Sequence, residues 1–116
     1  MKVVVILNDA PYGSERSFNA LRLADVLLKL EEDCELTVAL LGDAVHCAKA
    51  GQTTPNGYYN IARMLAPIVR RGLVLVCETC MEARGLTVQD LVEGCRQAKL
   101  GEVGMAVLEA DRVLTF

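Results

Sequence analysis

Three short apolar runs recur along the chain, and segments with helical patterns separate them. The runs are KVVVILN (residues 2–8), CELTVALLG (34–42) and GLVLVC (72–77), all rich in Val, Ile and Leu. Strands that are buried on both faces have this composition, and they occur mainly in parallel sheets covered by helices. The alternation of such runs with helical segments therefore predicts an α/β fold, with a parallel sheet and helices on both of its faces.

The segments between these runs place apolar side chains at helical spacing. A helix is expected from Ser14 to about Leu30, with Ser14 as its N-cap. Asp43 is expected to cap a short helix that reaches about Ala50. The other expected elements are a helix from Tyr58 through Ile68, short helices over 78–83 and 86–94, a helix over 100–110 and a strand over 112–116. Pro67 should bend or end its helix early.

These elements occupy 116 residues, a length that suits one domain over residues 1–116. We expect a mainly parallel, open sheet of about four or five strands. If the first three strands lie in the order 2-1-3, the strand order reverses between the first and the third. Ligands of open α/β sheets bind at such a reversal, outside the carboxyl ends of the strands. The loops NDAPYGSE (8–15) and CETC (77–80) would then lie side by side at this point.

The charge and hydropathy of the chain argue against two classes of partner. The net charge is -3, so the chain lacks the basic surface of a nucleic-acid-binding protein. No apolar run approaches the roughly 20 residues that a membrane helix needs. The N-terminal run is brief and leads to Asn8 and Asp9 rather than to a signal cleavage site, so we expect a cytoplasmic protein. An apolar content of 53% is high for so small a domain and indicates subunit interfaces.

The pair of cysteines in CETC stands out among five cysteines. An odd number of cysteines without an export signal indicates free thiols, most of them buried as small apolar side chains. Cys77 should lie at the end of a strand and the start of a helix, where unpaired N–H groups and the helix dipole favour a thiolate. Cys80 follows one turn later, and Arg84 could add positive charge to it. Glu78 and Glu82 would oppose ionisation if they pointed inward.

Other interpretations of the pair remain open. Cys77 and Cys80 could be two core residues at a strand–helix junction. A structural zinc site commonly needs four ligands, and the candidates for the other two, His46 and Cys47, are adjacent residues with poor geometry for two ligands on a helix, so we expect neither a metal nor another cofactor. A dithiol of the thioredoxin type also has CxxC at a helix N-terminus, but the Trp and Gly-Pro that typically surround it are missing.

The loop NDAPYGSE supplies candidate pocket residues, namely Asn8, Tyr12 and Gly13. A loop before a helix can bind an anion, but this one lacks the repeated glycines of a phosphate loop and carries Asp9 and Glu15. We therefore expect an ordinary loop beside the thiols, with Tyr12 in the wall around Cys77.

The chain as a whole resembles the DsrE/DsrF-like family, and within it the small YchN-type branch. The resemblance rests on NDAPYGSERSFNALRLA, LGDAV, GQ...GYYNIARML, CETCMEARG and ADRVLTF, which occur in this order. It implies a three-layer α/β/α domain and homo-oligomers, typically hexamers. In the related sulfur-transfer proteins DsrEFH and TusBCD, a cysteine after a strand carries a persulfide and stands eight residues before the Gly of an Arg-Gly. Cys77 matches that position, with Arg84 and Gly85 as the matching pair.

The resemblance leads to three hypotheses of different classes. In the first, the protein is a sulfur carrier whose catalytic cysteines are Cys77, which accepts sulfane sulfur, and Cys80, which resolves or briefly holds it. The resemblance also implies donor and acceptor proteins as partners. In the second, the protein is a homo-oligomeric scaffold or binding module with structural cysteines. In the third, Cys77 and Cys80 exchange between dithiol and disulfide. Exposure of Cys77 in a cleft would favour the first over the second.

Overall fold

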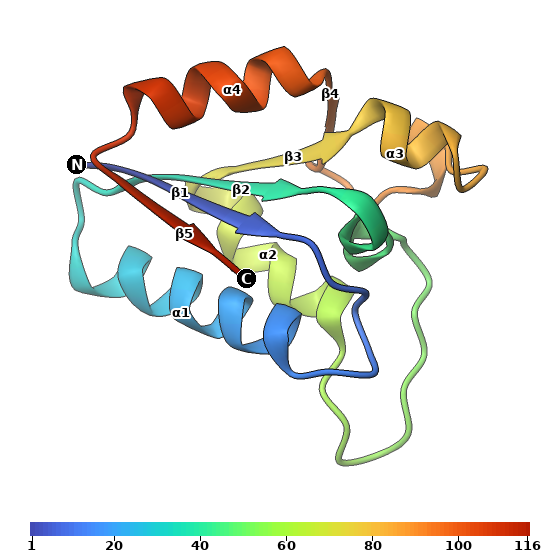
Figure 1. Cartoon of the computed structure of the whole chain (residues 1–116). Coiled ribbons are helices and arrows are strands. Elements are labelled where there is room, and N and C mark those ends of the chain that lie inside the picture. The colour runs from blue at the N-terminus through green and yellow to red at the C-terminus, as the bar shows by residue number, and fades with distance from the viewer.

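Five strands form a single parallel sheet in the order β4-β3-β2-β1-β5 (Figure 1). The structure is a computed structural model that describes residues 1–116. The strands are β1 (Lys2–Leu7), β2 (Glu35–Leu40), β3 (Leu73–Cys77), β4 (Arg96–Ala98) and β5 (Arg112–Thr115). The α-helices are α1 (Arg16–Leu30), α2 (Ile61–Arg71), α3 (Glu78–Glu82) and α4 (Leu100–Glu109), and the 3₁₀ helices are η1 (Gly42–Ala48) and η2 (Val88–Asp90).

Helices cover the sheet from both sides, which confirms the predicted fold class. Helices α1 and α2 lie on one face and α4 on the other, while α3 lies beyond the carboxyl end of β3 (Figure 1). The main hydrophobic core fills the space between the sheet and α1 and α2, and 24 buried residues form it. The face toward α4 has a much smaller core of four residues, Ala39, Leu75, Ala98 and Val103. None of the helices is both long and apolar enough to cross a membrane.

The predicted strand order 2-1-3 is wrong. β2 lies between β1 and β3, and it pairs with β1 along its whole length, from Glu35 opposite Lys2 to Leu40 opposite Leu7. Successive crossovers in one direction place α1 and α2 on the same face and extend the sheet from β1 to β4. Only β5 adds to the other side of β1, so the order reverses between β1 and β5. The alternation of strands and helices is compatible with either order, which is why it could not choose between them.

Two helices begin later than predicted, because side-chain hydrogen bonds hold the residues before them in a non-helical turn. α1 begins at Arg16 rather than at Ser14. The Ser14 hydroxyl donates to the Asp9 carboxylate at 2.9 Å and accepts from the Arg16 N–H at 3.4 Å. α2 begins at Ile61 rather than at Tyr58, because the Asn60 side chain caps it by accepting from the N–H of the third residue at 3.1 Å.

Two further elements differ from the prediction. Pro67 lies inside α2 and does not end it, since the helix continues to Arg71 with Leu65 and Ile68 fully buried on either side of the proline. Burial of this apolar face outweighs the one hydrogen bond that the proline cannot donate. β4 was not predicted, because its three residues, Arg-Gln-Ala, carry no apolar pattern and only pairing with β3 makes them a strand. The short helix predicted over 86–94 is only the three-residue η2, which follows Thr87 as its N-cap, and the Thr87 N–H donates to the Asp90 carboxylate at 2.8 Å.

Candidate functional site

Cys77 is the last residue of β3 and the N-cap residue of α3. Its sulfur accepts a hydrogen bond from the Cys80 N–H at 3.4 Å, and the Thr79 hydroxyl lies 3.5 Å from it. The sulfur therefore takes the place that a Ser or Asp oxygen takes in an ordinary N-cap. This is the junction that the sequence predicted. Cys77 is nevertheless only 3% exposed, so the chain around it covers the thiol almost completely.

The hydrogen bonds at this junction shift the pKa values of the two thiols in opposite directions. Burial opposes ionisation of Cys77, but hydrogen bonds from the side chains and N–H groups of Cys80 and Thr79 outweigh it, so the pKa of Cys77 lies below its ordinary value. Burial and the hydrogen bond that it gives to Cys77 raise the pKa of Cys80. Cys77 is thus the thiol that ionises more readily, in the direction expected from its place at the helix N-terminus.

The loop after β2 completes the surroundings of the cysteine pair. Arg84 donates to the Cys80 carbonyl at 2.9 Å, and its guanidinium forms an ion pair with Asp43 of η1 at 2.9 Å. The Gly42 N–H approaches the Cys80 sulfur and favours its thiolate. Asp43 was predicted to cap η1, but its side chain makes no capping hydrogen bond. It pairs with Arg84 instead and so links η1 to the segment after α3.

Sequence reasoning missed Gly42 and Asp43 because it placed the first strand next to the third. The carboxyl ends of the neighbouring strands β2 and β3 carry the loops that meet here. The motif LGDAV, which contributed to the family resemblance, contains both residues and is the signal that could have found them.

The candidate residues of the first loop contact other parts of the chain. The backbone and side-chain N–H groups of Asn8 donate to the Phe116 carbonyl at 3.0 and 3.3 Å, beside β5. The Tyr12 hydroxyl donates to Gln52 at 2.6 Å and accepts from the Ile61 N–H at 3.2 Å, so it ties the loop before α2 to the loop after β1. Gly13 has a φ of 106° and allows the turn that precedes α1. None of these three residues hydrogen-bonds to Cys77 or Cys80.

The remaining cysteines lie in the main hydrophobic core or pack against it, and all five thiols are free. Burial raises the pKa of Cys47 to about 12 and that of Cys95 to about 11. Cys34 is buried in the main core. No group of three or more His, Cys, Asp or Glu side chains is arranged to hold a metal ion.

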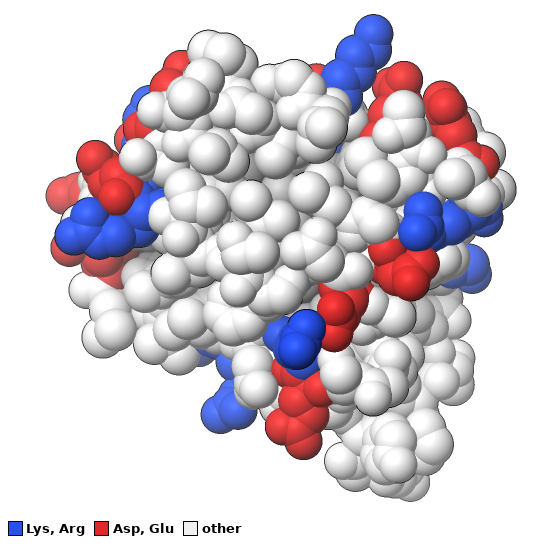
Figure 2. Space-filling view, in the orientation of Figure 1, with Lys and Arg blue, Asp and Glu red and all other residues white.

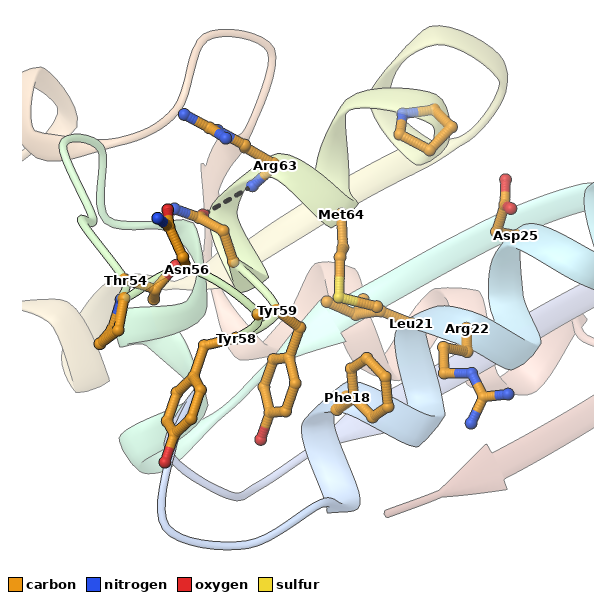
Figure 3. A pocket seen from close by; sticks show the side chains of 14 residues that line it. Phe18, Leu21, Arg22, Asp25, Thr54, Asn56, Tyr58, Tyr59, Arg63 and Met64 are labelled. Carbon is orange, nitrogen blue, oxygen red and sulfur yellow. Dashed lines mark hydrogen bonds between the residues drawn. The ribbon is translucent and has the colours of Figure 1, made fainter.

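A separate pocket of about 620 Å³ lies between α1 and α2 and under the loop that joins η1 to α2 (Figure 3). Phe18 and Tyr59 stack in its wall with ring centroids 4.1 Å apart. The guanidinium carbon of Arg22 lies over the Phe18 ring, 5.2 Å from the ring centroid. Neither Cys77 nor Cys80 lines this pocket. It is therefore distinct from the cysteine site.

Comparison with known proteins agrees with the overall fold of the chain. The sequence model of the DsrE/DsrF-like family matches residues 1–116. The chain belongs to the DsrE/DsrF-like family. Protein YchN of Escherichia coli K12 is 40% identical over 116 residues, which cover 99% of this chain and 98% of YchN. The crystal structure of the E. coli YchN protein superposes with a TM-score of 0.94 over 99% of this chain and 98% of that chain.

Two other relatives in this family extend the comparison. The uncharacterized protein MJ0989 of Methanocaldococcus jannaschii is 40% identical over 117 residues and covers the full length of both chains. A sulfurtransferase TusD homologue of Vibrio vulnificus is 28% identical over 131 residues, which cover 100% of this chain and 98% of the relative. The expected family resemblance is thus confirmed over the whole chain.

We expect Cys77 of this DsrE/DsrF-like protein to react before Cys47 and Cys95. A thiol is nucleophilic in its ionised form, which dominates above its pKa, so near neutral pH Cys77 should hold the largest thiolate fraction. Cys47 and Cys95 stay protonated until the pH approaches about 12 and about 11. Iodoacetamide labelling followed by peptide mass mapping should find Cys77 labelled first, and unfolding the protein in denaturant should erase the order. Labelling of Cys47 or Cys95 ahead of Cys77 would contradict the assignment.

Proposed function

We propose that this protein is a cytoplasmic persulfide carrier in a sulfur relay, with Cys77 as the sulfur-accepting residue. The observation that carries the proposal is the Cys77 sulfur at the β3–α3 junction, hydrogen-bonded so that its pKa is lowered. A relative that matches the whole chain is named a sulfurtransferase TusD homologue, which supports sulfur relay at the level of the family. Donor and acceptor proteins with exposed thiols would be its partners.

The proposed transfer is a displacement at sulfur and needs no oxidant. The Cys77 thiolate attacks the outer, sulfane sulfur of a donor persulfide. A bond forms between the Cys77 Sγ and that sulfur, the S–S bond of the donor breaks, and the donor leaves as a thiolate. Attack of an acceptor thiolate on the outer sulfur of the Cys77 persulfide reverses these events and restores the Cys77 thiolate. The lowered pKa of Cys77 helps both steps, because Cys77 is a thiolate when it attacks and a thiolate when it leaves.

Cys80 has two possible tasks in this scheme, and each balances. Its thiolate can attack the outer sulfur and hold it as a second persulfide, beside the Gly42 N–H and the Arg84 side chain. It can instead attack Sγ of Cys77, which forms a Cys77–Cys80 disulfide and releases hydrosulfide, and a dithiol reductant then restores both thiols. The second route is also the chemistry of a dithiol–disulfide exchange protein.

The near-complete burial of Cys77 favours a second candidate function. A carrier thiol has to meet the sulfur of another protein, yet Cys77 is 3% exposed and does not line the pocket between α1 and α2. If it stays covered, the cysteines are structural and the protein is a homo-oligomeric scaffold or binding module. Carriage therefore needs a small displacement of α3, whose five residues are too few to form a stable helix alone.

Mass spectrometry of the intact protein and of its proteolytic peptides, after incubation with a persulfide donor, tests the two candidates. A carrier gains the mass of one sulfur atom on the Cys77 peptide, and a thiol reductant removes it. Unchanged mass at Cys77, together with slow alkylation of the same residue in the native protein, would support the scaffold.

We also propose that the protein is a homo-oligomer, with a hexamer as the expected state. α4 buries only Val103, whereas Leu100, Met105 and Leu108 are 61%, 56% and 81% exposed. Figure 2 shows a broad area without charged side chains over β5 and the adjoining parts of α1 and α4, with charges gathered at its rim. An area without charges, together with large exposed apolar side chains on α4, is typical of a protein–protein interface.

Multi-angle light scattering at micromolar concentration should therefore give the mass of a multimer. Replacing Leu108 by Asp should shift the mass toward the monomer, because a carboxylate in an apolar interface loses its hydration without gaining a partner. Val88→Asp is the matched control, since Val88 is 52% exposed on η2, next to α3, and its substitution should leave the mass unchanged. A wild-type protein with a stable monomer mass would contradict the proposal.

A further inference from the structure

Thr79 is an exposed residue whose hydroxyl makes one hydrogen bond within the protein, with the Cys77 sulfur at 3.5 Å. It lies at the second position of α3, between Cys77 and the Cys80 N–H that also reaches this sulfur. A Thr hydroxyl near a helix N-terminus commonly serves the backbone instead, as a cap or a turn. Here Cys77 itself is the N-cap residue, so the Thr79 hydroxyl is free to serve the sulfur.

We propose that Thr79 is a positioning residue of the Cys77 site, whose hydroxyl donates a hydrogen bond to the Cys77 thiolate and keeps the sulfur ready to attack. The role of Thr79 in sulfur transfer rests on the proposed function, but its hydrogen bond to Cys77 can be tested without any sulfur transfer. Either group can donate while Cys77 is a thiol. A thiolate can only accept, so ionisation makes the Thr79 hydroxyl the donor.

Charged side chains around the sulfur do not supply this stabilisation. Glu78 precedes Thr79 on α3, and its carboxylate could only oppose a thiolate. Asp43 of η1 and Arg84 form an ion pair with each other at 2.9 Å, so each offsets the other's charge. The groups that lower the pKa of Cys77 against its burial are all hydrogen-bond donors of Cys80 and Thr79. Among them, the Thr79 hydroxyl can be removed without touching the cysteine pair or the backbone.

The test replaces Thr79 by Val, which has nearly the same shape but no hydroxyl, and by Ser, which keeps the hydroxyl. The rate of iodoacetamide labelling at Cys77 is measured by peptide mass mapping across pH on the full chain. In Thr79→Val the rate at neutral pH should fall about threefold to tenfold, the range that the net contribution of one ordinary hydrogen bond allows, because the contact at 3.5 Å is long. Its pH midpoint should move upward, and its limiting rate at high pH should equal or slightly exceed that of the wild type, because a thiolate of higher pKa is the stronger nucleophile. Thr79→Ser should restore the wild-type profile.

Three outcomes would overturn the inference. A Thr79→Val profile equal to the wild type would show that the hydroxyl does not stabilise the thiolate. A limiting rate at high pH far below the wild-type value would show that the substitution blocks access to Cys77 and that the loss of rate is steric. A Thr79→Ser profile equal to that of Thr79→Val would show that the methyl group matters rather than the hydroxyl. Circular dichroism and thermal unfolding of each variant confirm that the comparison is made between folded proteins.

Sulfur loading from a persulfide donor is measured separately on the same variants. If Cys77 is labelled as expected but never gains sulfur, the carrier function fails and the hydrogen bond from Thr79 still stands. If Cys77 gains sulfur at the same rate in all three proteins and their pH profiles coincide, the carrier function stands and the inference about Thr79 fails.

Discussion

Replacing Cys77 by Ser is expected to abolish loading of sulfur from a persulfide donor. The hydroxyl of Ser has about the same size, and it can still accept the N-cap hydrogen bond from the Cys80 N–H, so α3 should remain folded. It cannot form a persulfide, and Cys80 keeps the burial that is the largest cause of its raised pKa, so little Cys80 thiolate is present to take over the attack. Intact-protein mass spectrometry after a fixed incubation should find no added sulfur on the variant.

Cys80→Ser is the matched variant and should behave in the opposite way. Its hydroxyl can still donate to the Cys77 sulfur, as the Cys80 thiol does, so Cys77 should load at close to the wild-type rate. The loaded persulfide should last longer, because the neighbouring thiol that could take or resolve it is gone. If Cys77→Ser loads as fast as the wild type while Cys80→Ser does not load, the roles of the two cysteines are reversed.

Replacing Met81 by Ala is expected to lower the free energy of unfolding by about 2–5 kcal/mol, the range for emptying a fully buried Met site. Met81 is completely buried and anchors α3 to the main core, and its carbonyl accepts from the N–H groups of Arg84 and Leu86 at 3.0 Å. Urea unfolding at a fixed protein concentration, followed by circular dichroism, measures the change.

The same variant should expose Cys77. A helix of five residues depends on its tertiary contacts, so loss of the Met81 anchor should let α3 move away from the end of β3. Alkylation of Cys77 in the folded variant should therefore be faster than in the wild type. Val88→Ala is the control, because Val88 is 52% exposed and its truncation should change the unfolding free energy by less than about 0.5 kcal/mol. Wild-type stability in Met81→Ala would contradict the anchoring role of this side chain.

The amino-acid sequence by itself determined the elements whose signals are local. The Val- and Leu-rich runs became β1, β2 and β3, and their alternation with helical segments specified a parallel sheet between helices. The junction at Cys77 was also determined locally, since an apolar strand that ends on a cysteine and turns directly into a helix places that sulfur at the N-cap. For the same reason the sequence predicted that Cys77, rather than Cys80, has the lowered pKa.

Only the tertiary structure decided which loops share the site with the cysteines. The sequence pattern is the same whether β2 or β1 lies next to β3. In the structure β2 pairs with β1 on one side and with β3 on the other, which brings the loop of Gly42 and Asp43 to the cysteine pair and leaves Asn8 next to β5. β4 and the continuation of α2 past Pro67 likewise depend on neighbours that are distant in sequence. The same holds for the burial of Cys77. Strand order and burial arise from contacts between distant segments, and a local pattern of side chains does not encode which segments will meet.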